Sequence, residues 1–218
     1  MTYEAVLLDL YDTLVWSGWA KWERTLAAQL RVSEAELGRV FDETRPARSV
    51  GAHVDHNGDV AAVIEGLGME PTRELIQEVR SLEEREIMQD IYLFEDSLPV
   101  VRELRARGVR TALVSNCSHN TRPVVERLGL ETEFDVLILS FEVGSRKPQP
   151  EIYRIALERL GVSDPSRSVF VDDQAEYCDG GAAVGLQTRL ILRPDDPAES
   201  FAPSTNGHRV IKDLRALL

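Results

Sequence analysis

The first apolar run of the chain ends in a carboxylate. Residues 5–8 are Ala-Val-Leu-Leu, and they lead directly into Asp9-Leu10-Tyr11-Asp12-Thr13-Leu14. A carboxylate at the end of a buried strand can attack an electrophile if its charge is kept and its side chain is aimed. We therefore interpret this segment as a catalytic turn with Asp9 as the nucleophile. The alternative interpretation is an Asp that only caps a turn.

Three later segments also bring polar groups to, or just after, the ends of apolar runs. In chain order they are Leu113-Val114-Ser115-Asn116, Arg146-Lys147-Pro148 and Val169-Phe170-Val171-Asp172-Asp173. Two adjacent acids at the end of a buried strand repel each other unless something positive lies between them and Asp9. Ser115, Lys147 and the acidic pair are therefore candidate site residues.

Short apolar runs alternate with helical patterns along much of the chain. The runs are Val6–Asp9, Thr111–Ser115, Val136–Ser140, Ser168–Asp172 and Arg189–Leu192. The helical patterns are Pro99–Arg107, Arg122–Leu128 and Pro150–Leu160, and a glycine follows each of them. Buried strands that alternate with helices predict an α/β fold with a Rossmann-like parallel sheet. Ligands of such a sheet bind at the carboxyl ends of its strands, where Asp9, Ser115 and Asp172 fall.

Residues 15–93 break this alternation, because they contain several helical segments and no convincing strand. Ser33-Glu34-Ala35-Glu36 forms a capping box that opens one helix. An apolar stripe along another helix consists of Leu75, Ile76, Val79, Leu82, Ile87, Met88 and Ile91. We expect the weakest order of this region at residues 44–57. The predicted organisation is a core of residues 1–14 and 94–218 with an inserted α-helical cap of residues 15–93.

The composition restricts the partners of the chain. Its 218 residues suffice for one α/β core with an insertion, and its formal net charge is −12 with a pI near 4.9. Nucleic acid and anionic membrane surfaces repel such a chain. No apolar segment approaches the roughly 18 residues of a membrane span, and no basic leader opens the sequence. We expect a cytoplasmic protein that acts on a small molecule, with Cys117 and Cys178 as reduced structural thiols.

Taken together and in this order, the motif segments resemble those of the haloacid dehalogenase-like (HAD) hydrolase superfamily. The Lys-Pro context of Gly144-Ser145-Arg146-Lys147-Pro148 is similar to the third motif of that superfamily. The resemblance implies a Rossmann-like core with a helical cap. One residue departs from the pattern, since Tyr11 stands where the phosphatases of the superfamily carry a second Asp, two residues after the nucleophile.

The resemblance also implies a role for each motif residue. Asp9 would attack phosphorus or carbon of the substrate and form a covalent ester that water hydrolyses. Thr13 would support the turn and orient Asp9. Ser115 would hydrogen-bond the transferring group, with the backbone amide of Asn116 alongside. Lys147 would pair with Asp9 and with the negative charge that builds in the transition state.

A magnesium site is implied in the same way. Its ligands would be Asp9, the backbone carbonyl of Tyr11 and Asp173, with Asp172 close by. Oxygen ligands around a phosphoryl site suit Mg²⁺, which takes only one or two carboxylates from the protein. Tyr177 stands where many relatives carry Asn or Asp, and this replacement weakens the outer shell of the site.

Tyr11 leaves three functions open. The first is a slow or specialised Mg²⁺-dependent phosphatase, in which Asp12 or a cap residue transfers the proton that tyrosine handles poorly at neutral pH. The second is a 2-haloacid dehalogenase, because that family carries Tyr after its nucleophile and a Tyr that matches Tyr153. The dehalogenases are metal-free, however, and lack the acidic pair, so we favour the phosphatase. The third is a binding descendant without turnover that keeps the metal site.

The cap contains candidates for substrate selection. Arg45 and Arg48 are suited to bind an anionic tail of the substrate through bidentate hydrogen bonds, although exposed arginines are usually only solvated. Trp16, Trp19 and Trp22 lie at the junction of core and cap. They are expected to pack there, or to line the pocket.

Overall fold

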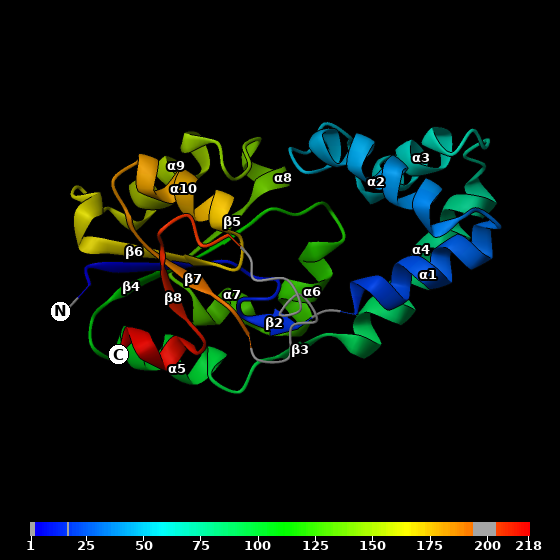
Figure 1. The fold of residues 1–218 in the computed structure, drawn as a ribbon. Coiled ribbons are helices and arrows are strands. Elements are labelled where there is room, and N and C mark those ends of the chain that lie inside the picture. Colours follow the sequence, from blue (N-terminus) through cyan, green and yellow to red (C-terminus); the bar gives the residue numbers. More distant parts are fainter. Residues whose placement is uncertain (1–2, 17, 194–203) are drawn as a thin grey trace.

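The structure of the protein is a computed structural model, and it describes residues 3–16, 18–193 and 204–218. A six-stranded parallel sheet has helices on both faces, and a further group of helices lies to one side of it (Figure 1). The strand order is β5-β4-β1-β6-β7-β8. The strands are β1 (Ala5–Leu8), β4 (Arg110–Ser115), β5 (Val136–Leu139), β6 (Ser168–Asp172), β7 (Gln187–Ile191) and β8 (Arg209–Ile211). The predicted α/β fold with a Rossmann-like sheet is confirmed.

Strand β1 lies inside the sheet, and all of its side chains are buried. It pairs with β4 and β6, so that Leu8 lies opposite Leu113 and Val171. Successive side chains of a strand point to opposite faces. One face of the sheet packs against α9 (Pro150–Leu160) and the other against α5 (Ser97–Ala106). Because both faces are covered, the strand is apolar throughout.

The helices of the core begin and end close to the glycine and proline signals in the sequence. Pro150 opens α9, and Gly161 follows it with a φ of 68°, in the left-handed region that glycine adopts without strain. The remaining helices of the core are α6 (Thr121–Arg127), α7 (Leu130–Glu133), α8 (Ser140–Val143), α10 (Ala175–Ala183) and the 3₁₀ turns Pro165–Arg167 and Leu214–Leu217. Proline-rich residues 194–207 predict a surface loop, and residues 194–203 of it lie outside the described residues.

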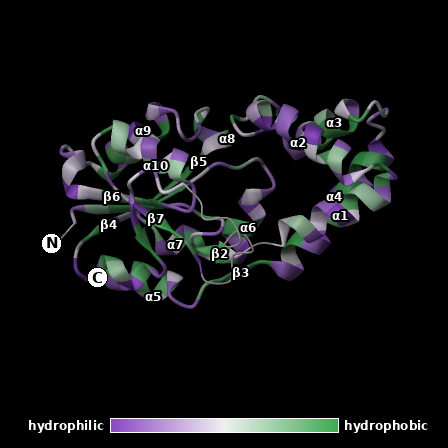
Figure 2. Ribbon diagram, in the orientation of Figure 1, coloured by the Kyte–Doolittle hydropathy of each residue, from purple (hydrophilic) through white to green (hydrophobic). Residues whose placement is uncertain are grey.

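The helical cap consists of α1 (Trp19–Leu30), α2 (Glu34–Arg48), α3 (His56–Gly66) and α4 (Arg73–Asp90). Ser33 is the N-terminal capping residue of α2, as predicted, since the backbone N–H of Glu36 donates to Ser33 Oγ at 3.1 Å. Hydrophobic and hydrophilic residues alternate along these helices (Figure 2), as expected for helices with one buried face. Within the described ranges, no helix is long and apolar enough to cross a membrane.

Two expectations for the cap region are wrong. Residues 44–57 are more regular than expected, because α2 continues to Arg48 and α3 begins at His56. The side chain of Arg48 holds the end of α2: Nη2 donates to the Phe41 carbonyl at 3.2 Å and Nε donates to Thr44 Oγ1 at 3.1 Å. The region also contains two short strands, which have too few residues to produce a periodic pattern in the sequence.

These short strands, β2 (Val15–Trp16) and β3 (Tyr92–Leu93), pair antiparallel at the two ends of the cap. The rings of Trp16 and Tyr92 stack with centroids 5.2 Å apart. Next to them, the backbone N–H of Phe94 donates to the carbonyl of Leu14 at 3.0 Å. The chain therefore enters and leaves the cap at neighbouring points. We keep the division into residues 15–93 and the remaining core as a proposal that this pairing supports.

Candidate active site

Asp9 lies at the carboxyl end of β1, between the ends of β4 and β6. Its backbone N–H donates to the Val171 carbonyl at 3.0 Å, which extends the sheet pairing by one residue. Lys147 lies in the loop between α8 and α9, and its Nζ is 2.5 Å from Asp9 Oδ1 and 2.6 Å from Asp172 Oδ2. Lys147 is 1% exposed and Asp9 is 6% exposed. The fold thus brings residues from three separate motifs into one shielded ionic cluster.

The carboxylates of Asp9, Asp172 and Asp173, of which the first two are buried and the third is partly buried, carry more negative charge than Lys147 can balance. One oxygen of each lies within 4.8 Å of the others. Burial raises the pKa of Asp9 to about 7 against the attraction of Lys147, and burial with repulsion from Asp172 and Asp9 raises the pKa of Asp173 to about 9. Burial alone would lower the pKa of Lys147, but Asp172 and Asp9 raise it above its ordinary value. A further positive charge is needed if all three carboxylates are to be ionised.

The oxygen atoms of this cluster fit a small hard cation such as Mg²⁺. Both oxygens of Asp172 are engaged, because Oδ2 accepts from Lys147 and Oδ1 accepts from the backbone N–H of Gln174 at 2.9 Å. Asp9 and Asp173 therefore have oxygens left for a metal, and the backbone carbonyl of Tyr11 belongs to the same turn as Asp9. Asp172, also predicted as a metal residue, belongs to the same cluster, and both of its oxygens already accept hydrogen bonds.

Thr13 and Ser115 lie beneath the site, and neither is among the residues that line the cavity. Both side chains are fully buried, and in the part of the chain that the structure describes neither hydroxyl has a hydrogen-bond partner. Asn116 lines the cavity. Its Nδ2 donates to the Lys147 carbonyl at 2.9 Å, and its Oδ1 accepts from the Lys147 N–H at 2.7 Å. The Asn116 side chain therefore fixes the loop that carries Lys147, a contact that the sequence did not indicate.

Tyr11 forms a wall of the cavity on the side of the cap. Its hydroxyl lies 2.9 Å from Thr121 Oγ1, and its ring meets Trp19 edge to face with centroids 5.5 Å apart. Burial raises the pKa of Tyr11 above its ordinary value of 10.0. The phenol is therefore neutral at physiological pH and held by Thr121, so it is a poor proton acceptor.

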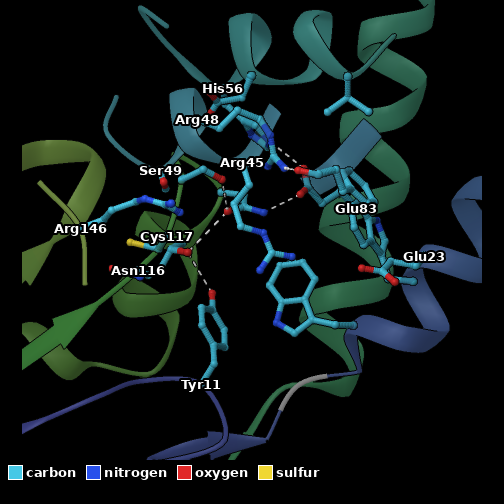
Figure 3. A pocket seen from close by; sticks show the side chains of 18 of the residues that line it. Tyr11, Glu23, Arg45, Arg48, Ser49, His56, Glu83, Asn116, Cys117 and Arg146 are labelled. Atoms are coloured by element: carbon cyan, nitrogen blue, oxygen red, sulfur yellow. Dashed lines mark hydrogen bonds and ion pairs between the residues drawn. The ribbon is translucent and has the colours of Figure 1, made fainter. Parts of the chain in front are cut away.

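A cavity of about 350 Å³ extends from Asp9 to the helical cap (Figure 3). Its apolar lining from the cap consists of Trp19, Trp22, Leu26, Phe41, Val60, Val63 and Val79. Two of the three junction tryptophans thus line the pocket. Arg45 and Arg48 also line it, but Arg48 is held by the carbonyl of Phe41 and by Thr44. Arg45 points into the cavity (Figure 3) and is the stronger candidate for a substrate contact.

Charged side chains of the cap contact the loop that follows β4. Asn120 Nδ2 donates to Glu83 Oε1 at 2.6 Å, and His119 Nδ1 lies 2.7 Å from Asp59 Oδ2. His56 Nε2 lies 2.6 Å from Glu83 Oε2 (Figure 3). The charged run at residues 83–86 predicts a solvated helix face, and for Glu83, which is 5% exposed, this is wrong. Glu83 is buried because its carboxylate finds partners on both the cap and the core.

A second buried ion pair lies behind the turn that follows Asp9. Arg193 Nη1 is 2.8 and 2.9 Å from the two carboxylate oxygens of Asp96, and its Nε donates to the Thr13 carbonyl at 3.1 Å. Asp96 also accepts from the backbone N–H of Leu214 at 2.6 Å. The guanidinium lies 4.2 Å from the centroid of the Phe94 ring. This pair joins the turn after Asp9 to the start of α5, and no sequence motif indicated it.

The fold and the site define the class of the protein, a Rossmann-like α/β protein with a carboxylate cluster at the carboxyl edge of its sheet. The model of the haloacid dehalogenase-like hydrolase family matches residues 3–185. The chain therefore belongs to the haloacid dehalogenase-like hydrolases, and the resemblance of its motifs is confirmed.

The proteins to which the chain is similar have more than one named activity. The chain is 29% identical over 126 residues to a phosphatase of Mycobacterium tuberculosis, covering 57% of the chain and 54% of the relative. It is 33% identical over 131 residues to (S)-2-haloacid dehalogenase 1 of a Pseudomonas species, covering 59% and 57%. A HAD family enzyme of Bacteroides thetaiotaomicron, solved with magnesium, has a TM-score of 0.72 at 18% identity and covers 93% of the chain and 100% of that structure. The chain spans about half the length of the curated relatives it matches.

Proposed function

We propose that the chain is a Mg²⁺-dependent phosphatase that hydrolyses a phosphate monoester of a small metabolite through an aspartyl-phosphate on Asp9. The cluster of Asp9, Asp172 and Asp173 carries this proposal, because three closely spaced acids beside one lysine need a cation to stay ionised. The relative named a phosphatase favours the same activity, and the neighbour solved with magnesium favours the same metal.

Asp9 supplies the nucleophile in this mechanism. One of its carboxylate oxygens attacks phosphorus, the bond to the leaving oxygen breaks, and water then hydrolyses the aspartyl ester. Lys147 Nζ, 2.5 Å from Asp9 Oδ1, holds the carboxylate and offsets negative charge on the transferring group. The backbone N–H of Asn116, which lines the cavity, binds an oxygen of that group, and the hydroxyl of Ser115 lies buried beneath it. Asp9, Asp173 and the Tyr11 carbonyl would hold Mg²⁺, which would supply positive charge beside that group.

Tyr11 does not replace the missing acid/base Asp. Its hydroxyl is engaged with Thr121, and its raised pKa prevents it from taking a proton from water near neutral pH. We therefore propose that turnover is slow for leaving groups that must be protonated. Phosphate esters of acidic alcohols, which leave as anions, should be the better substrates.

Hydrolysis of a carbon–halogen bond is the second candidate function. Tyr11, Tyr153 and the dehalogenase among the relatives favour it. Tyr153, however, is fully buried and donates to the Tyr177 carbonyl at 2.7 Å, and it is not among the residues that line the cavity. This contact, together with the acidic pair, favours the phosphatase. Binding without turnover is the third candidate.

Magnesium removal tests the proposal. Hydrolysis of 4-nitrophenyl phosphate should proceed with Mg²⁺ and fall by about 10²-fold in excess chelator, because the cluster then lacks its compensating charge. Release of nitrophenolate measures the rate, and halide release from 2-chloropropionate in chelator serves as the parallel assay. Halide release without phosphatase activity would favour the dehalogenase, and absence of both activities would favour the binding function.

Tyr11→Asp should raise kcat toward alkyl phosphates by up to about 10²-fold, because a carboxylate at this position can donate a proton to the leaving oxygen and then accept one from water. Steady-state kinetics at saturating Mg²⁺ measure the change. Tyr11→Phe is the matched control, since it removes only the hydroxyl and should leave kcat within about twofold. A kcat for Tyr11→Asp at or below that of Tyr11→Phe would contradict the assigned role of this position.

A further inference from the structure

We propose that the leaving group of the natural substrate carries a second anionic group, and that Arg146 of the core and Arg45 of the cap bind this group together. The inference rests on the proposed phosphatase function and adds the class of substrate. That class is the phosphate monoester of a small acid.

Arg146 is the first of the two arginines. It directly precedes Lys147, lines the cavity and points into it from the core (Figure 3). Its backbone N–H is engaged by Gln149 Oε1 at 3.0 Å. Its guanidinium has neither an ion pair nor a hydrogen bond to any residue that the structure describes, although the side chain is half-buried. A partly desolvated guanidinium without a partner favours an anion in the cavity.

Arg45 approaches the same cavity from helix α2 (Figure 3). Its ion pair with Asp42 has an N···O distance of 3.5 Å and joins side chains that are 58% and 77% exposed. Such a pair contributes little to stability and is easily exchanged for a ligand. Arg48, one helical turn further on, is held by the Phe41 carbonyl and is not available in this way. The two arginines without strong protein partners thus come from opposite walls of one cavity.

Two of the acids at the cap end of the cavity are held by closer partners than Arg45 and Arg146. Asp59 and Glu83 are engaged by partners on the loop that follows β4. Glu23 also lines the cavity, but burial raises the pKa of its carboxyl, against the attraction of Arg45. Arg45 and Arg146 therefore leave this end of the cavity attractive to an anion.

The size and lining of the cavity restrict the rest of the substrate. About 350 Å³ must hold the phosphoryl group at Asp9 and the second anion at the arginines. The apolar surface supplied by Trp19, Trp22 and Phe41 suits a short carbon chain between the two groups.

Binding of phosphonates, which have no ester to hydrolyse, tests the inference without turnover. With Mg²⁺ present, isothermal titration should find carboxymethyl, 2-carboxyethyl or 3-carboxypropyl phosphonate bound about 10- to 100-fold more tightly than the alkyl phosphonate of matched length. Arg146→Gln and Arg45→Gln should each reduce this preference by about tenfold. Arg154→Gln is the control. Arg154 is exposed on α9, pairs with Glu151 at 3.9 Å and does not line the cavity, so its removal should keep the preference.

The double variant Arg45→Gln/Arg146→Gln should lose less of the preference than the sum of the single losses, because both arginines bind one group. Equal affinity for both kinds of phosphonate, or no binding of either, would overturn the inference. A variant of Arg45 or Arg146 that weakens the binding of carboxyalkyl and alkyl phosphonates equally would also overturn it, since that arginine would then bind the phosphoryl group. Failure of the proposed function has a different signature, the absence of Mg²⁺-dependent turnover of 4-nitrophenyl phosphate.

Discussion

Asp9→Asn should reduce kcat/KM for 4-nitrophenyl phosphate by about 10⁴-fold or more. An amide oxygen is a far weaker nucleophile than a carboxylate, so the aspartyl ester does not form. The fold should survive, because Lys147 keeps its contact with Asp172 and one of the mutually repelling carboxylates is removed. Nitrophenolate release measures turnover, and urea unfolding of the same preparation measures stability.

Glu151→Gln is the matched control for Asp9→Asn. It makes the same chemical change at a carboxylate that is 63% exposed on α9. Both its turnover and its free energy of unfolding should stay close to those of the wild type. An Asp9→Asn variant that keeps turnover within tenfold of the wild type would remove Asp9 from the nucleophile position and leave the aspartyl-phosphate mechanism without support.

Arg193→Met should lower the free energy of unfolding by about 3–5 kcal/mol, as expected when one partner of a buried ion pair is removed. Asp96, which is 2% exposed, would lose its partner, and the Thr13 carbonyl would lose a donor. Urea unfolding measures the change. The control is Arg102→Met. Arg102 is 62% exposed and forms an ion pair of 2.6 Å with Glu133, so its removal should lower the free energy of unfolding by less than about 1 kcal/mol.

Acid dependence provides a second measurement of the same ion pair. Burial opposes ionisation of Asp96, but Arg193 and the Leu214 N–H hold its pKa below the ordinary value of 3.8. The resulting stabilisation is fully present above that ordinary value, and it is lost as the pH falls through the lower pKa of the folded state. The stability difference between wild type and Asp96→Asn should therefore be constant near neutral pH and shrink below about pH 4. In the unfolding experiment, equal losses of the free energy of unfolding for Arg193→Met and Arg102→Met would contradict the stabilising role of the Asp96–Arg193 ion pair.

Much of the core could be predicted because its signals are local. Strands β1, β4, β5 and β6 each contain an apolar run of three or four residues, and Pro150 and Gly161 mark the ends of α9. The position of Asp9 followed from the same logic, since a polar residue directly after a buried strand lies at the edge where parallel strands end. The contact of Lys147 with Asp9 came from the family resemblance, because 138 residues separate the two in the chain.

The contacts that sequence reasoning missed depend on tertiary packing. Glu83 belongs to a charged run that is typical of a solvated helix face, and only the neighbouring loop with Asn120 makes its burial favourable. Arg193 follows β7 as a single charged residue, and its partner Asp96 is far away in the chain. Arg48 holds the end of helix α2 through a hydrogen bond to the carbonyl of Phe41 in the same helix, and no periodicity of the sequence encodes this contact.

The antiparallel pairing of Val15 with Leu93 also bears on how such a protein can diversify. Everything between these two residues begins and ends at almost the same place, so replacing it leaves the flanking chain undisturbed. A new set of helices grafted there would present different side chains to Asp9, the proposed nucleophile. The choice of substrate can therefore change with the inserted helices, while the sheet that positions Asp9 stays the same.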